Sequence, residues 1–146
     1  MCPSKLFIFD EFGGISTQLS AMLNTRTRCA DSVVRGYQVH MDKWDPAIGD
    51  KFNTEIEVSN RHDRYAVAVK VNQDIVGHVP REISKVLFYF IKNGGMVDGE
   101  VRGKRQRSCV LEKGLEIPCV YRFSSSATQL LTKLTRLLRK ECVTTY

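Results

Sequence analysis

The densest group of side chains that could do chemistry is Asn60, Arg61, His62, Asp63 and Arg64, which stands directly before an apolar run. His62 beside Asp63 could in principle orient an imidazole for acid–base catalysis. Adjacent residues of an extended chain point to opposite faces, however, so the pair has poor geometry for a catalytic dyad. Two alternatives remain for this cluster: an ordinary polar turn, or a binding edge that a rigid sheet holds in place.

A second charged segment carries four cations within six residues, namely Arg102, Lys104, Arg105 and Arg107. Flexible cationic loops neutralise phosphates and bind nucleic acid in a salt-sensitive way that does not depend on base sequence. The alternative is a solvated loop between two strands.

Trp44 is the single tryptophan of the chain and follows Lys43 in a polar loop. An exposed aromatic ring next to a cation is the combination that base stacking requires. The alternative is that the Trp44 ring covers the end of the folded body. Both interpretations stay open from the sequence.

Other classes of site are not indicated. The chain has no G-x-S-x-G, P-loop, H-E-x-x-H or Gly-rich dinucleotide turn, so we expect neither an enzyme nor a cofactor. The three histidines fall at no metal-ligand spacing, and the five cysteines are irregularly spaced without a C-x-x-C pair. This pattern favours reduced thiols in an intracellular protein over disulfides.

Composition limits the partner and the compartment. The 146 residues suit one domain with a real core, and the formal net charge of +6 permits an anionic partner, with nucleic acid first. The apolar run LFIF near the start is shorter than a signal-peptide core of roughly 7–15 residues. No run approaches the roughly 18 apolar residues of a membrane span. We therefore expect a soluble nuclear or cytoplasmic protein.

The elements that must position these side chains are mostly short strands. Residues 52–58 alternate between apolar and polar types, which is typical of a strand with one buried face. Short strands separated by turns, with one packed helix, indicate a small β-barrel. The predicted strands lie at residues 33–40, 52–58, 66–71, 75–79, 96–101, 109–111 and 116–123.

Two helices are predicted. The first follows Pro80 and carries an apolar stripe at helical spacing, namely Ile83, Val86, Leu87, Phe90 and Ile91. The second follows a triple serine near residue 124 and carries the stripe Leu130, Leu131, Leu134, Leu137 and Leu138. This second stripe could dock on the body, on a partner, or on another copy. We divide the chain into an N-terminal flank (1–31), a barrel domain (32–123) and a C-terminal amphipathic helix (124–146).

Residues from about 33 to 123 resemble the HIRAN domain, a module fused to helicases of the SNF2 remodeller class and also found as a stand-alone protein. The resemblance rests on two spaced motifs, NRHDRYAVAV at residues 60–69 and IVGHVPRE at residues 75–82, with Arg35-Gly36 and Gly49 before them. A helix follows the second motif in the family, as it is predicted to do here.

The resemblance implies an OB-like barrel of about six strands and a site for the free 3′ end of single-stranded DNA. In that site Asp63 would recognise the terminal hydroxyl, while His62 and the Lys43–Trp44 pair would hold bases. The family has a further aromatic residue near the position of Leu115, and a leucine cannot stack in the same way.

The chain also departs from the family pattern inside the first motif. Arg61 replaces a proline and Tyr65 replaces an asparagine, so we expect the loop to be set differently. We therefore predict a nucleic-acid-binding module for single-stranded DNA or DNA 3′ ends. The alternative is a protein-interaction module in which the barrel is a scaffold and the leucine stripe meets the partner.

Overall fold

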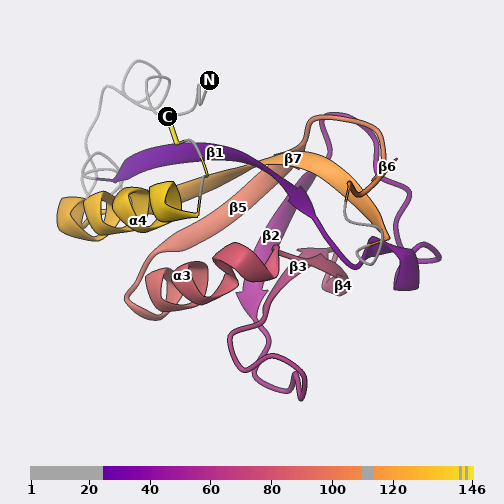
Figure 1. Cartoon of the computed structure of the whole chain (residues 1–146), viewed down its shortest axis with the longest axis horizontal. Helices are drawn as coiled ribbons and strands as arrows, with labels where there is room; N and C mark the ends of the chain where they lie inside the picture. The colour runs from indigo at the N-terminus through magenta and orange to yellow at the C-terminus, as the bar shows by residue number, and fades with distance from the viewer. Residues whose placement is uncertain (1–24, 110–113, 142, 144) are drawn as a thin grey trace, which may run out of the picture.

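The chain forms an antiparallel sheet of seven strands, with helices packed on it (Figure 1). The computed structural model describes residues 25–109, 114–141, 143, 145 and 146. The strands are β1 (Arg26–Val34), β2 (Lys51–Ile56), β3 (Val67–Val71), β4 (Asp74–His78), β5 (Met96–Val101), β6 (Gln106–Arg107) and β7 (Leu115–Ser125). The helical elements of the described residues are the 3₁₀ turn η1 (Tyr37–Val39), α3 (Arg81–Lys92) and α4 (Thr128–Lys140).

The sheet curls but does not close into a full barrel. Its strand order is β1-β7-β5-β2-β3-β4, with β6 paired to β7. One bridge joins the two ends of this order: the Arg35 amide donates to the His78 carbonyl (2.9 Å), and the His78 amide donates to the Arg35 carbonyl (2.8 Å). The predicted class, a small β-dominated fold with a packed helix and a C-terminal helix, is confirmed.

One hydrophobic cluster joins the sheet to both helices. Phe52 from β2, Tyr121 from β7, Leu87 from α3 and Leu138 from α4 all belong to it. The rings of Phe52 and Tyr121 meet edge to face with centroids 5.7 Å apart. Burial of these large apolar groups is the main stabilising contribution to the fold.

Helix α3 forms where the apolar stripe predicts it. Ile83, Leu87 and Phe90 are buried, which is the i, i+4, i+7 spacing of one helical face. The helix begins directly after Pro80 and ends at Lys92, with Asn93 as its C-cap. Gly94 follows with a φ of +95°, a left-handed conformation that favours glycine after a helix.

Helix α4 packs against α3, β1 and β7, so the leucine stripe docks on the body of its own chain. Leu131, Leu134 and Leu138 are at most 2% exposed. The prediction that Leu134 and Leu138 meet a partner is therefore not supported, because their side chains are already covered. Leu130 and Leu137 stay partly exposed.

The first predicted strand was misplaced. Strand β1 runs from Arg26 to Val34 and pairs with β7 over its full length, so residues 26–31 belong to the sheet although they were assigned to the flank. Gly36 adopts a left-handed φ of +71° and turns the chain into η1, which ends the strand before residues 37–40. The remainder of the predicted flank, residues 1–24, lies outside the described residues.

The last predicted hairpin also differs. The strand that forms this hairpin with β7 is β6 (Gln106–Arg107), whereas Cys109 lies outside any strand and residues 110 and 111 are not described.

The cysteines differ in their oxidation state. The expectation of reduced thiols is wrong at Cys29, which is disulfide-bonded. Cys109 and Cys119 are free, and burial raises the pKa of the Cys119 thiol to about 12. No helix in the described part of the chain is long and apolar enough to cross a membrane.

Candidate functional site

The loop between β2 and β3 is held in shape by its own polar side chains. The Asn60 carboxamide oxygen accepts hydrogen bonds from the backbone amides of His62 (2.8 Å) and Asp63 (2.9 Å). One oxygen of Asp63 then accepts from the backbone amide of Tyr65 (2.9 Å). Asn and Asp commonly fix turns in this way. These hydrogen bonds thus fix the turns of the loop although the family proline and asparagine are absent.

The β3–β4 hairpin brings the second motif beside this loop. His78 pairs with Ala68 across the hairpin, and α3 starts immediately after it, at Arg81. The Arg81 guanidinium donates to the backbone carbonyl of His62 (2.9 Å). Between the two motifs lies a hollow of about 170 Å³, which we call the Asp63 hollow. Its lining residues are Asn60, His62, Asp63, Ala66, Val67, His78, Val79 and Arg81.

The Asp63 carboxylate retains hydrogen-bonding capacity on one oxygen. Its Oδ1 is used by the Tyr65 amide, whereas its Oδ2 lies 3.5 Å from the Ser84 hydroxyl and 3.8 Å from Arg81 Nε. Both Oδ2 contacts are long for hydrogen bonds. The side chain is 18% exposed, and a carboxylate only accepts hydrogen bonds. Asp63 Oδ2 can therefore accept a hydrogen bond from a hydroxyl group of a ligand.

Arg81 supplies the opposite charge at the same hollow. Its side chain is 72% exposed, and one of its terminal nitrogens is engaged by the His62 carbonyl. A guanidinium has five N–H donors in a planar fork that matches phosphate oxygens. The hollow thus combines an acceptor for a hydroxyl with a donor array for a phosphate.

A second ionisable pair stands at the side of the hollow. His78 Nε2 lies 2.5 Å from a carboxylate oxygen of Glu57, which also accepts from the Asn60 carboxamide (3.1 Å). Burial alone would raise the pKa of Glu57, but the hydrogen bonds from Asn60 and His78 outweigh it and lower the pKa. His40 lies nearby, and partial burial followed by the charge of His78 lowers the pKa of His40.

Comparison of the sequence with models of known families assigns the chain to one of them. The family model of the HIRAN domain matches residues 16–116. The chain belongs to the HIRAN domain family. Among curated proteins, no sequence relative matches the chain.

Solved HIRAN domains share the fold. The crystal structure of the HIRAN domain of human HLTF aligns with a TM-score of 0.61 at 18% identity, covering 77% of this chain and 88% of that chain. An NMR structure of the HLTF HIRAN domain aligns with a TM-score of 0.54 at 18% identity, covering 77% and 90%. At this level of identity the likeness establishes the fold alone.

Within this HIRAN fold, some of the predicted site residues come together. His62 and Asp63 line the Asp63 hollow. Arg61 and Arg64 are exposed on the same loop, and the Arg64 guanidinium lies 5.0 Å from the ring centroid of Tyr65. These four positions remain candidates for contact with a nucleic acid.

Trp44 is not available as a stacking platform. Its side chain is 7% exposed and belongs to the hydrophobic core. Its ring meets Tyr37 edge to face at 6.1 Å, and the Tyr37 hydroxyl donates to the Trp44 carbonyl (2.8 Å). The interpretation of Trp44 as a base-stacking residue is therefore wrong, because its faces are covered by the fold. Lys43 beside it is exposed.

The basic loop lies away from the hollow. Strand β2 separates the two, because Lys51 at its start pairs with the end of β5 whereas Ile56 at its end pairs with Val67 (Figure 1). Six strand residues span about 20 Å. The cations of the loop are exposed, and Arg102 lies 3.4 Å from Glu100. Arg102, Lys104, Arg105 and Arg107 could thus meet a longer strand but do not line the hollow.

Sequence reasoning missed three lining residues: Asn60, His78 and Arg81. All three lie inside the two motifs, but they were assigned no binding role from the sequence. The predicted hairpin between the motifs was the available signal, since it brings their ends together. Leu115 is partly buried against the core, as its aliphatic side chain suggests.

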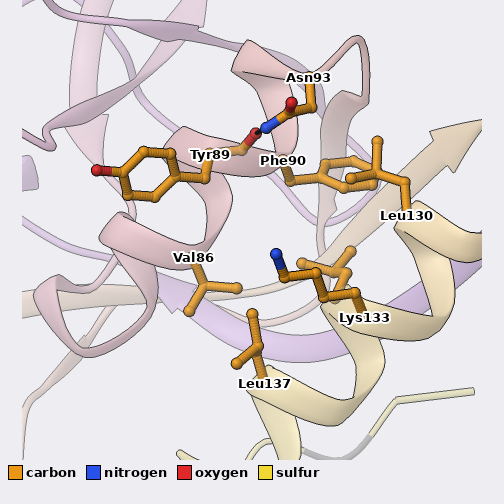
Figure 2. A pocket seen from close by; sticks show the side chains of 8 residues that line it. Val86, Tyr89, Phe90, Asn93, Leu130, Lys133 and Leu137 are labelled. Atoms are coloured by element: carbon orange, nitrogen blue, oxygen red, sulfur yellow. Dashed lines mark hydrogen bonds between the residues drawn. The ribbon is translucent and has the colours of Figure 1, made fainter.

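A second hollow, of about 40 Å³, lies between α3 and α4 (Figure 2). Val86 and Phe90 on one helix face Leu130 and Leu137 on the other, with Lys133 as the charged group. This lining is mainly apolar and lacks the paired acceptor and donor of the Asp63 hollow. It is therefore the weaker candidate for ligand chemistry.

Proposed function

We propose that this HIRAN domain binds single-stranded DNA and holds its 3′ end in the Asp63 hollow. The observation that carries the proposal is the placement of the Asp63 carboxylate beside the Arg81 guanidinium in one hollow. The net charge of +6 supports a polyanionic partner. Membership of the HIRAN family, which the sequence motifs indicated, supports the same class of ligand.

The chemistry of a strand end matches the two charged groups. A 3′-terminal nucleotide has one hydroxyl that can donate to Asp63 Oδ2 and one phosphate that can accept from Arg81. His62 is exposed at the rim of the hollow and offers an imidazole ring for stacking on a base. Sequence preference is not expected, because none of these contacts distinguishes one base from another.

A phosphate at the 3′ end should bind poorly. Two unit charges about 4 Å apart repel each other by about 1 kcal/mol in water and about 4 kcal/mol at an effective dielectric constant of 20. Asp63 is 18% exposed and lies between these limits. We therefore expect a 3′-phosphate to weaken binding by about tenfold or more.

Fluorescence anisotropy at low salt tests the proposal. The ligands are labelled single strands that end in a 3′-hydroxyl or a 3′-phosphate, and the proteins are the wild type and Asp63→Asn. The amide oxygen of Asn can still accept from the Tyr65 amide, so the loop is preserved while the charge is lost. Discrimination between the two ends should shrink in Asp63→Asn and persist in Asp98→Asn, whose carboxylate pairs with Arg122 on the sheet.

The outcomes separate two levels of the proposal. Equal affinity of the wild type for both ends would remove 3′-end recognition and leave general DNA binding. Absence of binding to either strand at low salt would remove both. If Asp98→Asn lost discrimination as Asp63→Asn does, the effect would not come from the Asp63 hollow.

A protein-interaction role through the leucine stripe is the second candidate. The residues still open to a partner are Leu130 and Leu137, which line the groove between α3 and α4 (Figure 2). Light scattering tests self-association directly. A dimer that dissociates in Leu130→Ser/Leu137→Ser would favour this candidate, whereas a monomeric wild type would oppose self-association.

A further inference from the structure

Three aromatic rings form a patch outside the Asp63 hollow. Tyr65 comes from the β2–β3 loop, whereas Phe88 and Tyr89 come from α3. Their ring centroids are 5.3 Å (Tyr65–Phe88), 5.8 Å (Tyr65–Tyr89) and 5.4 Å (Phe88–Tyr89) apart. Tyr89 is 46% exposed, and the other two rings are partly exposed. We call this group the aromatic patch.

Cations stand over the rings of the aromatic patch. The Arg64 guanidinium and the Lys85 ammonium lie 5.0 Å and 5.2 Å from the centroid of Tyr65. The Lys92 ammonium lies 5.4 Å from the centroid of Phe88. All three distances are within the roughly 6 Å range of cation–π attraction, and all three cationic residues are exposed. The patch therefore presents aromatic surface and positive charge together.

Part of this arrangement serves the fold, because Tyr65 packs the loop onto α3. That role does not require an exposed Tyr89 or three cations around the rings. In Figure 2 the Tyr89 ring projects away from α4, while the residue also borders the groove between α3 and α4. Aromatic faces next to cations are the features with which single-stranded nucleic acids are bound without sequence preference.

The patch continues directly from the Asp63 hollow. The Tyr65 amide donates to the Asp63 carboxylate, so the two sites share one loop. Along α3, Arg81 at the hollow is followed by Lys85 and Tyr89 at successive turns. Eight helical residues span about 12 Å. Bases stacked about 3.4 Å apart cover this length with three to four nucleotides.

We propose that the aromatic patch is a second binding site, which stacks on bases of the strand on the 5′ side of the end held in the hollow. The proposal rests on the proposed function and deepens it, because it assigns a path to the strand as well as a site to its end. Tyr65 and Tyr89 contact the bases, and Arg64, Lys85 and Lys92 contact the phosphates.

A length series of oligonucleotides tests the patch. The ligands are a thymidine dinucleotide and a thymidine octanucleotide, both with a 3′-hydroxyl, and binding is measured by anisotropy competition. Loss of one base–aromatic stack corresponds to about a five- to 150-fold change in affinity. Tyr89→Ala should weaken octanucleotide binding within this range and leave dinucleotide binding unchanged. Tyr89→Phe keeps the ring and should bind like the wild type.

The controls separate stacking from folding and from charge. Tyr146 is a similarly exposed tyrosine (44%) beside β1, so Tyr146→Ala should leave octanucleotide binding unchanged. An octanucleotide whose six 5′ positions are abasic keeps the phosphates but offers no base to Tyr65 or Tyr89, so it should bind the wild type at least as weakly as the intact strand binds Tyr89→Ala. Urea unfolding of each variant shows that the fold is retained.

The binding results distinguish failure of the aromatic patch from failure of the Asp63 hollow. If Tyr89→Ala binds the octanucleotide as tightly as the wild type, or if the abasic strand binds as tightly as the intact one, the patch is not a stacking site. Binding of the dinucleotide would then still support the Asp63 hollow. If the wild type binds neither oligonucleotide, the proposed function and the patch both fail. Equal competition by a glutamate-rich peptide would assign the patch to an acidic protein and overturn the proposal.

Discussion

A methyl group added at Gly77 should break the bridge that joins Arg35, directly after β1, to His78 in β4. A Cβ atom at residue 77 would lie 2.5 Å from Val34 Cγ1 and 2.7 Å from the backbone oxygen of Arg35. Real Cβ atoms essentially never approach other atoms so closely, and the Arg35 oxygen cannot rotate away as a side chain can. Gly77→Ala must therefore push the chain after β1 away from β4.

The cost can be worked out from the contacts that this movement breaks. Two backbone hydrogen bonds join Arg35 and His78, and each contributes about 0.5–1.5 kcal/mol. Overpacking without movement would cost about 1–3 kcal/mol. The two costs are alternatives, because the movement that relieves the contact breaks the bonds. We therefore expect a loss of about 1–3 kcal/mol, an appreciable part of a typical stability of about 5–15 kcal/mol.

Urea unfolding followed by the fluorescence of Trp44 measures this loss, since Trp44 is the single tryptophan and is buried. With a slope of about 1–3 kcal/mol/M, the midpoint should fall by about 1 M. Gly103→Ala is the matched control, because its Cβ would meet the Pro118 side chain at 3.1 Å, and it should cost less than about 1 kcal/mol. Equal midpoints for the two variants would refute the close approach of Arg35 to Gly77. Because His78 lines the Asp63 hollow, Gly77→Ala should also weaken binding of a 3′-hydroxyl strand.

Two further predictions concern α4 and acid stability. Leu134→Ala should cost about 2–5 kcal/mol because Leu134 is buried, whereas Leu137→Ala on the same helix should cost less than about 1 kcal/mol. Equal urea midpoints for these two variants would contradict the docking of α4. The lowered pKa of His40 means that the unfolded chain takes up this proton first as the pH falls below the ordinary value of 6.5, so stability decreases there. The lowered pKa of Glu57 adds a loss of the same sign as the pH falls below its ordinary value of 4.5. Urea midpoints between about pH 5 and 8 should vary less in His40→Gln than in the wild type, and an identical pH dependence would contradict this assignment.

The parts of the fold that could be predicted are those with a strong local pattern. The apolar stripe around Leu87 and the glycine after the helix sufficed to predict α3. The β3–β4 hairpin followed from two apolar runs around a polar turn, in which Asn72 and Gln73 take positive φ values. In both cases neighbouring residues decide the structure, so no tertiary information was needed.

Strand β1 and the burial of Trp44 depend on distant contacts. The sequence of β1, RTRCADSVV, lacks alternation, and two of its three buried residues, Cys29 and Ala30, are small. Its strand conformation comes from pairing with β7, about ninety residues later. Trp44 stands among polar residues, and its burial follows from contact with Tyr37 in η1, an element that was itself predicted as part of a strand.

The candidate site likewise combines residues that a local sequence pattern indicates with residues that only the folded chain brings together. Asp63 and His62 could be selected because they stand in a dense charged cluster. The acceptor role of Asn60, the approach of Arg81 and the position of His78 appear only when the two motifs fold side by side. The distance of the basic loop from the hollow likewise depends on the sheet order, which a single sequence does not encode in any local pattern.

A titration of the ¹⁵N-labelled protein with a 3′-hydroxyl dinucleotide, followed by NMR, tests the central claim most directly. The proposal predicts that the largest saturable shifts occur at the backbone amides of His62, Asp63 and Arg81, and that a 3′-phosphate dinucleotide leaves them nearly unchanged. Shifts concentrated in the basic loop at residues 102–107, with these three amides unmoved, would contradict the assignment of the Asp63 hollow as the site of the strand end.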